Sequence, residues 1–536
     1  MSKKLFFILI FIGLISVFFT VFQKTPAPPC FNADEAAFSY NAYSILKTGK
    51  DEYGVTLPLR LKSFGDFKMP LYTYLSIPFT ALFGLNEFGA RSLNIVLSFI
   101  LPFSIYFLTT ELFKNKKIGL LSAFLASTSL GLHIISRQVH EAYLATILTT
   151  ITSYFFLKLL QKKTLINYIF FSLFSLLLLF SYHPGRLFIL FFLGFTIIYT
   201  LFEKRKEKHN RWNVILIIVC IFIFFTLTDF IYKPERLQNL VFFNNPGFAL
   251  KINELKTEGG IKYLYNPFFV GLKDTFLQHL TYFSPQFLLM NGDENYRFGY
   301  PGMSIFTPIE YLFVFIGIYF LFMNKEKWRW LLLSLVFISP LSASLSWSTG
   351  SLTRSLFLLI PLFILASYGF VCLMQQFKNK QKKYYLALLF LIFSFFIVFS
   401  WDFYLFHYPK RLITIHAWQC GYKEVNSFIK QNYNQYDTFY ITKEVGMPYI
   451  FTLFYLQYSP EKYQKQASLT KADEYGFGQV ERFDKFIFSF KSPELAEKRS
   501  VIIGSIDDFK GLKDFDTTQL QTISINGEPM FQIYKN

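Results

Sequence analysis

The sequence predicts a mostly α-helical, polytopic membrane protein that ends in a small extracytoplasmic α/β domain. Of its 536 residues, 53% are hydrophobic and 21% are aromatic, whereas only 16% are charged. Water-soluble domains do not show this balance. Apolar runs close to the roughly 18 to 20 residues that cross a bilayer as a helix recur through the first three quarters of the chain. The chain is therefore expected to cross a membrane many times.

About eleven apolar segments are expected to form transmembrane helices in a domain spanning residues 1–401. The first has the outline of a signal peptide, but no small-x-small cleavage motif follows it, so we interpret it as an uncleaved span. The expected spans lie at about residues 5–22, 88–110, 118–135, 142–160, 165–181, 187–202, 212–231, 306–323, 330–346, 355–374 and 384–401.

The formal net charge of +18 comes from short basic clusters between the apolar runs. This distribution is the one that the positive-inside rule predicts for cytoplasmic loops, and it disfavours nucleic acid as a partner. We expect a plasma (inner) membrane protein, surrounded by membrane lipids, with a cytoplasmic N-terminus and an extracytoplasmic C-terminal domain. The clusters are Lys3 and Lys4; Lys114, Lys116 and Lys117; Lys162 and Lys163; Lys204, Arg205, Lys206, Lys208 and Arg211; Lys325, Lys327 and Arg329; and Lys378, Lys380, Lys382 and Lys383.

The opposite face is expected to carry two long loops, at about residues 23–87 and 232–305, and the tail over residues 402–536. Within the first loop, the segment Leu71–Gly84 is apolar but short, with Pro70 directly before it and Pro78 inside it. It is therefore expected to be a helix that lies at the membrane interface. In the tail, helical periodicity covers Trp418–Tyr433, and Thr438–Thr442 and Val501–Gly504 resemble strands. Asn526-Gly527 predicts a closing hairpin.

Four cysteines exclude a disulfide-rich scaffold and a zinc ribbon. Cys220 and Cys372 fall inside apolar runs and are interpreted as small core residues. Cys30 and Cys420 share the predicted outer face, and the sequence leaves open whether they form a bridge.

The first candidate for chemistry is the pair Asp34-Glu35, which follows the first span. Lys68 lies at the start of the expected interfacial helix, where its ammonium group could meet a lipid phosphate. The simpler interpretation is that the carboxylates are solvated loop charges and that the lysine snorkels toward the interface. The other outer polar residues decide between these interpretations.

Arginines on the predicted outer face run against the positive-inside bias, so each needs an anionic partner. That partner is a ligand in one interpretation and a carboxylate of Asp34, Glu35 or Glu141 in the other. A histidine beside a proline, as at His183, is more often structural than a metal ligand. The candidates in the short outer turns are Arg137, His140 and Glu141, then Tyr182, His183 and Arg186, and finally Arg354.

Several enzyme and transporter classes lack support. Motifs typical of metalloproteases, nucleotide triphosphatases and serine hydrolases do not occur. Transporters usually place charges near the bilayer midplane, whereas the expected spans are nearly free of charge. Polar chemistry at one membrane surface is therefore favoured.

With these residues in place, the chain resembles the GT-C-fold glycosyltransferases, in particular the branch of protein O-mannosyltransferases and lipid A aminoarabinose transferases. One departure is Met69, where the family has a second proline, and another is Glu141, where relatives often have aspartate. The resemblance rests on the Asp34-Glu35 pair, Lys68-Met-Pro-Leu-Tyr, Ala90-Arg91-Ser-Leu-Asn94, the Arg137 to Glu141 turn, Gly292-Asp293-Glu-Asn295-Tyr-Arg297, Pro340 through Arg354-Ser355, and Gly421-Tyr-Lys-Glu-Val.

The resemblance implies transfer of a sugar from a polyprenyl-phosphate donor to an acceptor hydroxyl at the outer face, by one inverting displacement. Asp34 matches the catalytic aspartate, with Glu35 beside it. The acceptor stays unknown, no cofactor is required, and a divalent metal is left open. The alternatives are a flippase or transporter of lipid-linked sugars and an O-antigen ligase or polymerase-like enzyme. Residues expected to bind substrate are Lys68, Arg137, Glu141, Tyr182, His183, Arg186, Asp293 and Arg354.

Overall fold

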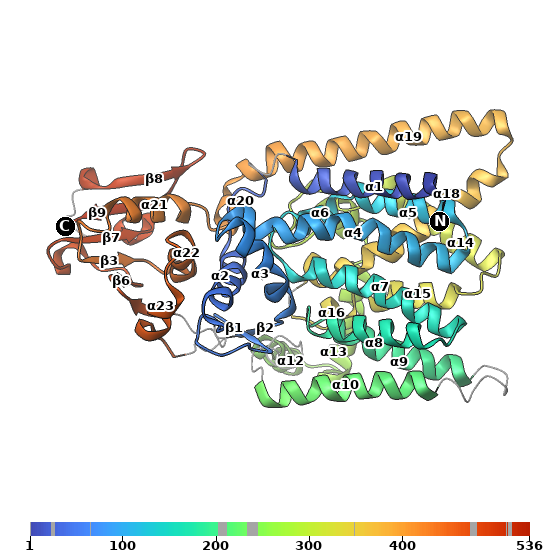
Figure 1. Cartoon of the computed structure of the whole chain (residues 1–536), viewed down its shortest axis with the longest axis horizontal. Helices are drawn as coiled ribbons and strands as arrows, with labels where there is room; N and C mark the ends of the chain where they lie inside the picture. The colour runs from blue at the N-terminus through green and yellow to red at the C-terminus, as the bar shows by residue number, and fades with distance from the viewer. Residues whose placement is uncertain are drawn as a thin grey trace. The chain divides into compact units, whose positions relative to one another are not determined.

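A computed structural model describes residues 2–22, 27–64, 66–201, 212–232, 245–347, 349–471, 480–510, 512 and 517–536. The chain forms two compact units (Figure 1). Unit 1 contains Met1–Phe22 and Asn94–Tyr404, and unit 2 contains Gln23–Leu93 and Leu405–Asn536. The whole of the expected first outer loop is thus grouped with the C-terminal tail. The division after Tyr404 lies close to the expected domain boundary at residue 401.

Unit 1 is helical, and apolar side chains cover most of its helices. The predicted polytopic, mostly α-helical fold class is confirmed. Its helices are α1 (Lys3–Val21), α4 (Glu87–Phe113, which crosses the division between the units), α5 (Lys116–Thr128), α6 (Leu130–Ser136), α7 (Glu141–Gln161), α8 (Leu165–Leu179), α9 (Gly185–Leu201), α10 (Trp212–Tyr232), α12 (Pro246–Glu258), α13 (Pro267–Thr281), α14 (Pro308–Met323), α15 (Arg329–Ile338), α16 (Leu341–Ser344), α17 (Leu352–Ser355), α18 (Leu359–Gln376) and α19 (Asn379–Asp402), with short 3-10 or π turns at Lys262–Leu264, Gln286–Asn291 and Leu356–Leu358.

Five spans among the described residues are long and apolar enough to cross a membrane, or six if the bent pair α5 and α6 forms one span. That pair bends by 57°. Six other apolar helices are shorter, at 10–17 residues. The expected number of about eleven spans therefore stays a prediction, as does the interfacial position of α3 (Leu71–Phe83), one of those shorter helices.

Close helix packing in unit 1 depends on two glycines. A Cβ atom at Gly317 of α14 would lie 2.2 Å from the carbonyl oxygen of Leu365 in α18. A Cβ atom at Gly369 of α18 would lie 2.4 Å from the carbonyl oxygen of Phe313. Small residues let helix backbones approach in this way, so α14 and α18 form a tight pair.

Unit 2 begins with a segment that a disulfide joins to the tail. Cys30 and Cys420 are 390 positions apart in the sequence, but they are bonded and their Cα atoms lie 5.5 Å apart. This disulfide resolves the question that the sequence left open. The segment continues into α2 (Ala33–Thr48), the antiparallel strands β1 (Leu61–Ser63) and β2 (Asp66–Lys68), and α3.

The tail of unit 2 forms a seven-stranded mixed sheet with helices beside it (Figure 1). The strand order is β4-β5-β6-β3-β7-β9-β8, in which β3 runs parallel to both β6 and β7. The predicted hairpin at Asn526-Gly527 joins β8 and β9, and both residues have positive φ, as a type I′ turn requires. The elements are α20 (Leu412–Ala417), α21 (Tyr422–Asn432), β3 (Thr438–Ile441), α22 (Pro448–Tyr455), α23 (Pro460–Gln466), β4 (Ser468–Leu469), β5 (Val480–Phe483), β6 (Phe486–Ile487), β7 (Ser500–Gly504), α24 (Ile506–Lys510), β8 (Gln521–Ile525) and β9 (Glu528–Lys535), and short turns lie at Phe403–His407, Tyr408–Lys410, Pro493–Leu495 and Thr517–Gln519.

The predicted basic loop that contains Lys204, Arg205, Lys206, Lys208 and Arg211 lies outside the described residues, as do residues 233–244 of the second expected outer loop.

Candidate functional site

The predicted pair of carboxylates lies in the first turn of α2 in unit 2. Asn32 caps this helix: its side chain accepts a hydrogen bond from the backbone N–H of Glu35 (3.1 Å), and the Glu35 carboxylate accepts one from the backbone N–H of Asn32 (3.2 Å). This reciprocal arrangement is a capping box, which fixes the start of the helix. Because adjacent helix positions point in different directions, Asp34 and Glu35 enter different surroundings.

Asp34 keeps access to solvent and is paired with Lys68. Lys68 Nζ lies 2.7 Å from Asp34 Oδ1, and 35% of the Asp34 side chain is exposed. The ammonium group also lies over the rings of Phe38 (4.7 Å) and Phe64 (5.1 Å). Strand β2 ends at Lys68 and thereby brings it to the start of α2. The structure thus places one accessible carboxylate beside one cation.

Glu35 is fully buried and is held by Arg91 of α4. Arg91 Nε donates to Glu35 Oε1 (2.7 Å) and Arg91 Nη2 donates to Oε2 (2.8 Å), which is a bidentate pair. Arg91 Nη2 also donates to the carbonyl oxygen of Cys30 (3.0 Å). Both carboxylate oxygens of Glu35 are therefore engaged inside the protein. The sequence suggested Arg91 only as part of the family resemblance, without a role.

A further acid in unit 2, Glu52, was not anticipated from the sequence. It is buried, and neither carboxylate oxygen has a hydrogen bond of normal geometry among the described residues. Burial and, to a smaller extent, the nearby Asp51 carboxylate raise the pKa of Glu52 to about 8, although Asn41 and Lys68 oppose the shift. Glu52 lies in the loop between α2 and β1, where no sequence motif distinguishes it from a solvent-exposed glutamate.

Unit 1 contains a polar cavity of about 610 Å³ that brings together four of the predicted residues: Glu141, Tyr182, Asp293 and Arg354. Glu141 begins α7, Tyr182 lies between α8 and α9, Asp293 follows the turn at Gln286–Asn291, and Arg354 lies in α17. Other residues complete the lining that are not among those expected to bind substrate, although all except Phe298 lie in the segments that carry the family resemblance. They are His140, Glu294, Asn295, Arg297, Phe298, Trp347, Thr349, Ser351 and Thr353.

Asp293 organises one wall of this cavity. Its Oδ2 accepts a hydrogen bond from the backbone N–H of Leu352 (2.6 Å), and its Oδ1 accepts one from the backbone N–H of Asn295 (2.8 Å). Burial raises the pKa of Asp293 to about 7, although these hydrogen bonds and the charges of Arg354 and Arg297 oppose the shift. Asp293 therefore holds the loop that contains it against the start of α17.

Aromatic rings and opposite charges share the rest of the cavity. The His140 ring lies edge-on to Tyr182 (5.9 Å between ring centroids) and to Phe298 (5.7 Å). His140 Nδ1 lies 3.8 Å from a carboxylate oxygen of Glu141 and accepts a hydrogen bond from a backbone N–H at the start of α7. Arg354 Nη1 donates to the hydroxyl of Ser346. Rings, carboxylates and an arginine together suit a hydroxyl-rich, anionic ligand.

The remaining predicted residues of unit 1 do not line this cavity. Arg137 is fully buried; it donates to the carbonyl oxygen of Phe19 (2.7 Å) and lies against the rings of Trp401 and Tyr404. His183 and Arg186 contact each other, with 3.1 Å between Nδ1 and Nη2. Among the described residues, no group of three or more histidine, cysteine, aspartate or glutamate side chains is arranged to hold a metal ion.

Comparisons with known proteins agree with the resemblance seen in the sequence. A family model described as dolichyl-phosphate-mannose-protein mannosyltransferase matches residues 68–228. The structure of ArnT from Cupriavidus metallidurans in the apo state superposes with a TM-score of 0.50 at 10% sequence identity, and the match covers 93% of each chain. The predicted fold is therefore confirmed. The chain has the GT-C fold.

Two other solved structures are similar at lower scores. ArnT from the same organism bound to undecaprenyl phosphate has a TM-score of 0.47 and 9% identity over 99% of this chain and 98% of that one. Archaeal oligosaccharyltransferase AglB from Archaeoglobus fulgidus, in complex with an inhibitory peptide and a dolichol-phosphate, has a TM-score of 0.48 and 12% identity. That match covers 84% of this chain but 63% of AglB, so the chain spans less than two thirds of AglB. No curated protein matches the sequence.

The description of the family model agrees with the predicted class of enzyme, a glycosyltransferase.

Proposed function

We propose that this protein is a glycosyltransferase that moves a sugar from a polyprenyl-phosphate donor to an acceptor hydroxyl at the outer face of the membrane. The observation that carries the proposal is the accessible Asp34 carboxylate, held beside Lys68 while the neighbouring Glu35 is engaged by Arg91. The description of the matching family, which names a dolichyl-phosphate sugar, supports the class of donor.

The proposed reaction is a single displacement. Asp34 takes the proton from the acceptor hydroxyl as that oxygen attacks the anomeric carbon, and the bond from that carbon to the phosphate oxygen breaks. The anomeric centre inverts, and polyprenyl phosphate leaves. Lys68 lies next to the base and offers its charge to the departing phosphate. Glu35, enclosed with Arg91, positions the start of α2 and does not exchange protons with substrate.

The cavity in unit 1 is proposed to bind substrate. Arg354 supplies charge for a phosphate oxygen, Glu141 accepts hydrogen bonds from hydroxyl groups, and the Tyr182 ring contacts apolar faces of a sugar. Arg137 donates to a backbone carbonyl and lies against two aromatic rings, which favours a structural role over contact with the donor.

A transfer assay tests the enzyme class. Purified full-length protein is incubated with a polyprenyl-phosphate sugar labelled in the sugar, together with a hydroxyl-bearing acceptor extract, and release of unlabelled polyprenyl phosphate is measured. Transfer supports the proposal, and movement of the intact carrier across vesicles without cleavage identifies a flippase instead. The proposed step uses side-chain charges to stabilise the departing phosphate, so we expect transfer to persist after treatment with EDTA. If EDTA abolishes transfer and Mg²⁺ or Mn²⁺ restores it, a metal ion supplies that positive charge.

The proposed orientation places the N-terminus in the cytoplasm and Asn536 outside, because the basic clusters mark the cytoplasmic loops. A reporter that is active only outside the cytoplasm should work when fused after Asn536 and should fail when fused after Lys208. The reverse result would move the proposed site to the cytoplasmic face.

A further inference from the structure

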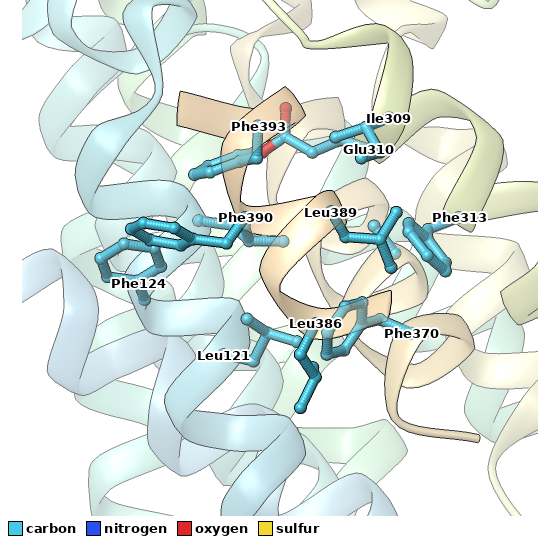
Figure 2. Close-up of a pocket in the computed structure, with 12 residues that line it drawn as sticks. Leu121, Phe124, Ile309, Glu310, Phe313, Phe370, Leu386, Leu389, Phe390 and Phe393 are labelled. Atoms are coloured by element: carbon cyan, nitrogen blue, oxygen red, sulfur yellow. The ribbon is translucent and has the colours of Figure 1, made fainter. Parts of the chain in front are cut away.

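Unit 1 also contains an apolar cavity of about 310 Å³ between α5, α14, α18 and α19 (Figure 2). Leucine and phenylalanine side chains from these helices dominate its walls. Among the lining residues that the structure describes, Glu310 is the one with an ionisable side chain. Its Oε2 accepts hydrogen bonds from the backbone N–H (2.8 Å) and hydroxyl (2.7 Å) of Thr307 in a capping box, so this group serves the start of α14.

The cavity lies at the periphery of the unit. In the apolar span that contains α19, only 17% of the residues are buried inside the protein, whereas 83% are buried in the span that contains α18. On the cavity side of α19, Leu386 is 37% exposed and Phe390 is 64% exposed. The tight glycine contact between α14 and α18 leaves α19 as the outer wall. The cavity therefore faces the bilayer, and hydrocarbon is the material available to fill it.

A lysine precedes the cavity by one helical turn on two of its walls. Leu121 is the first lining residue of α5 and follows Lys117 by four positions, and Leu386 is the first of α19 and follows Lys382 by four. Residues four apart lie on the same helix face. Both lysines are thus aligned with the cavity along their helices.

The two lysines lie at the same end of the cavity because α5 and α19 run in the same direction. The rings of Phe124 and Phe393 are 6.2 Å apart, and Trp401 Nε1 donates to the carbonyl oxygen of Thr128 (3.0 Å). Moving toward the C-terminus on α5 therefore corresponds to moving toward the C-terminus on α19. Lys117 and Lys382 precede both contacts, so they flank one mouth of the cavity.

We propose that this cavity binds one hydrocarbon chain of an anionic phospholipid whose phosphate lies between Lys117 and Lys382. Lipid tails are as apolar as the cavity, so the hydrocarbon chain binds by fitting the shape of the cavity. The two lysines provide the preference for an anionic headgroup. This mouth is at the end that carries the basic loops, whereas the proposed donor presents its phosphate at the outer face. The occupant is therefore a resident phospholipid and not the sugar donor.

The test compares full-length protein in nanodiscs of phosphatidylcholine alone with protein in nanodiscs that also contain phosphatidylglycerol. Thermal unfolding gives the stabilisation, and native mass spectrometry gives the phosphatidylglycerol retained after transfer to detergent. We expect phosphatidylglycerol to stabilise the parent protein. Lys117→Ala/Lys382→Ala should lower its retention about tenfold, and Leu386→Trp, which fills the cavity from its mouth, should lower retention with both lysines present.

Two matched variants serve as controls. Lys116→Ala removes the same charge one position away on α5, and Leu388→Trp adds the same bulk on α19 at a 54% exposed position outside the cavity. Both should retain phosphatidylglycerol. The proposal is overturned if the parent shows no preference for phosphatidylglycerol, if the controls lose as much as the test variants, or if Leu386→Trp retains it fully. Preferential retention of added undecaprenyl phosphate at the two lysines would also overturn it.

Discussion

The two polar regions of the molecule are built differently. At the start of α2 in unit 2, each carboxylate has one close cation: Lys68 for the partly exposed Asp34, and Arg91 for the enclosed Glu35. In unit 1, the cavity around Glu141 and Arg354 has a volume of about 610 Å³, and aromatic, acidic and basic side chains line it. Tight pairing fixes the direction of a reacting group, whereas a wide mixed lining suits recognition. This difference is the basis for proposing chemistry at the first region and substrate binding at the second.

The largest effect is expected from Asp34→Asn. This change keeps the shape and removes the ability to accept a proton, and general-base catalysis typically contributes on the order of 100- to 10,000-fold. The transfer rate should fall by that factor while the melting temperature stays near that of the parent. Asp274→Asn is the matched control, because Asp274 forms a comparable ion pair with Lys251 (2.6 Å) outside both regions. Parent-level transfer by Asp34→Asn would remove this residue from the chemistry.

Glu35→Gln tests the other half of the pair and should act on stability. Removing one partner of a buried ion pair typically costs about 3 to 5 kcal/mol, because the remaining charge is left unpaired. We expect a clear drop in the melting temperature and in the yield of folded protein. The double variant Glu35→Gln/Arg91→Met should recover part of the loss. A variant with unchanged stability that fails only in transfer would place Glu35 in the reaction.

The cavity in unit 1 should control substrate affinity more than the rate of the chemical step. Arg354→Ala removes one charge-assisted contact, typically about 1.5 to 3 kcal/mol, and should raise the KM for the donor roughly ten- to a hundredfold. Lys251→Ala removes a cation at an exposed ion pair and should leave the KM unchanged. A fall in kcat with unchanged KM would mean that Arg354 acts in the transition state and would weaken the division of roles.

A further prediction is a dependence of stability on pH that belongs to unit 2. The pKa of Glu52 in the folded protein, about 8, is above its ordinary value of 4.5. A raised pKa means that Glu52 favours folding most below the ordinary value, and that this contribution is lost as the pH rises through about 8. Glu52→Gln cannot ionise and should flatten the fall in melting temperature between pH 5 and pH 8.5. An unchanged pH profile would show that Glu52 is not the group responsible.

The sequence determined the class of structure. Hydrocarbon demands long apolar helices with internally satisfied backbones, so composition and run length predict a polytopic helical membrane protein. The GT-C fold, inferred from spaced motifs, is confirmed. Asn526-Gly527 predicts its hairpin from local backbone preference alone. The predicted strand Thr438–Thr442 contains β3, and the predicted strand Val501–Gly504 lies within β7. The apolar spans, the strands and the hairpin each depend on residues close together in the chain, whereas the fold family was inferred from the order of motifs along it. The assignment of individual site residues stays a prediction.

Only the tertiary structure decided which side chains meet. Asp34 and Glu35 are adjacent and chemically alike, yet one meets Lys68 and the other meets Arg91, 56 positions away. The cavity in unit 1 likewise gathers Glu141, Asp293 and Arg354 from distant segments. Cys30 and Cys420 are separated by 390 residues. No short-range pattern encodes such contacts, because they arise from how whole helices and loops pack, and burial then sets the charge and access of each group.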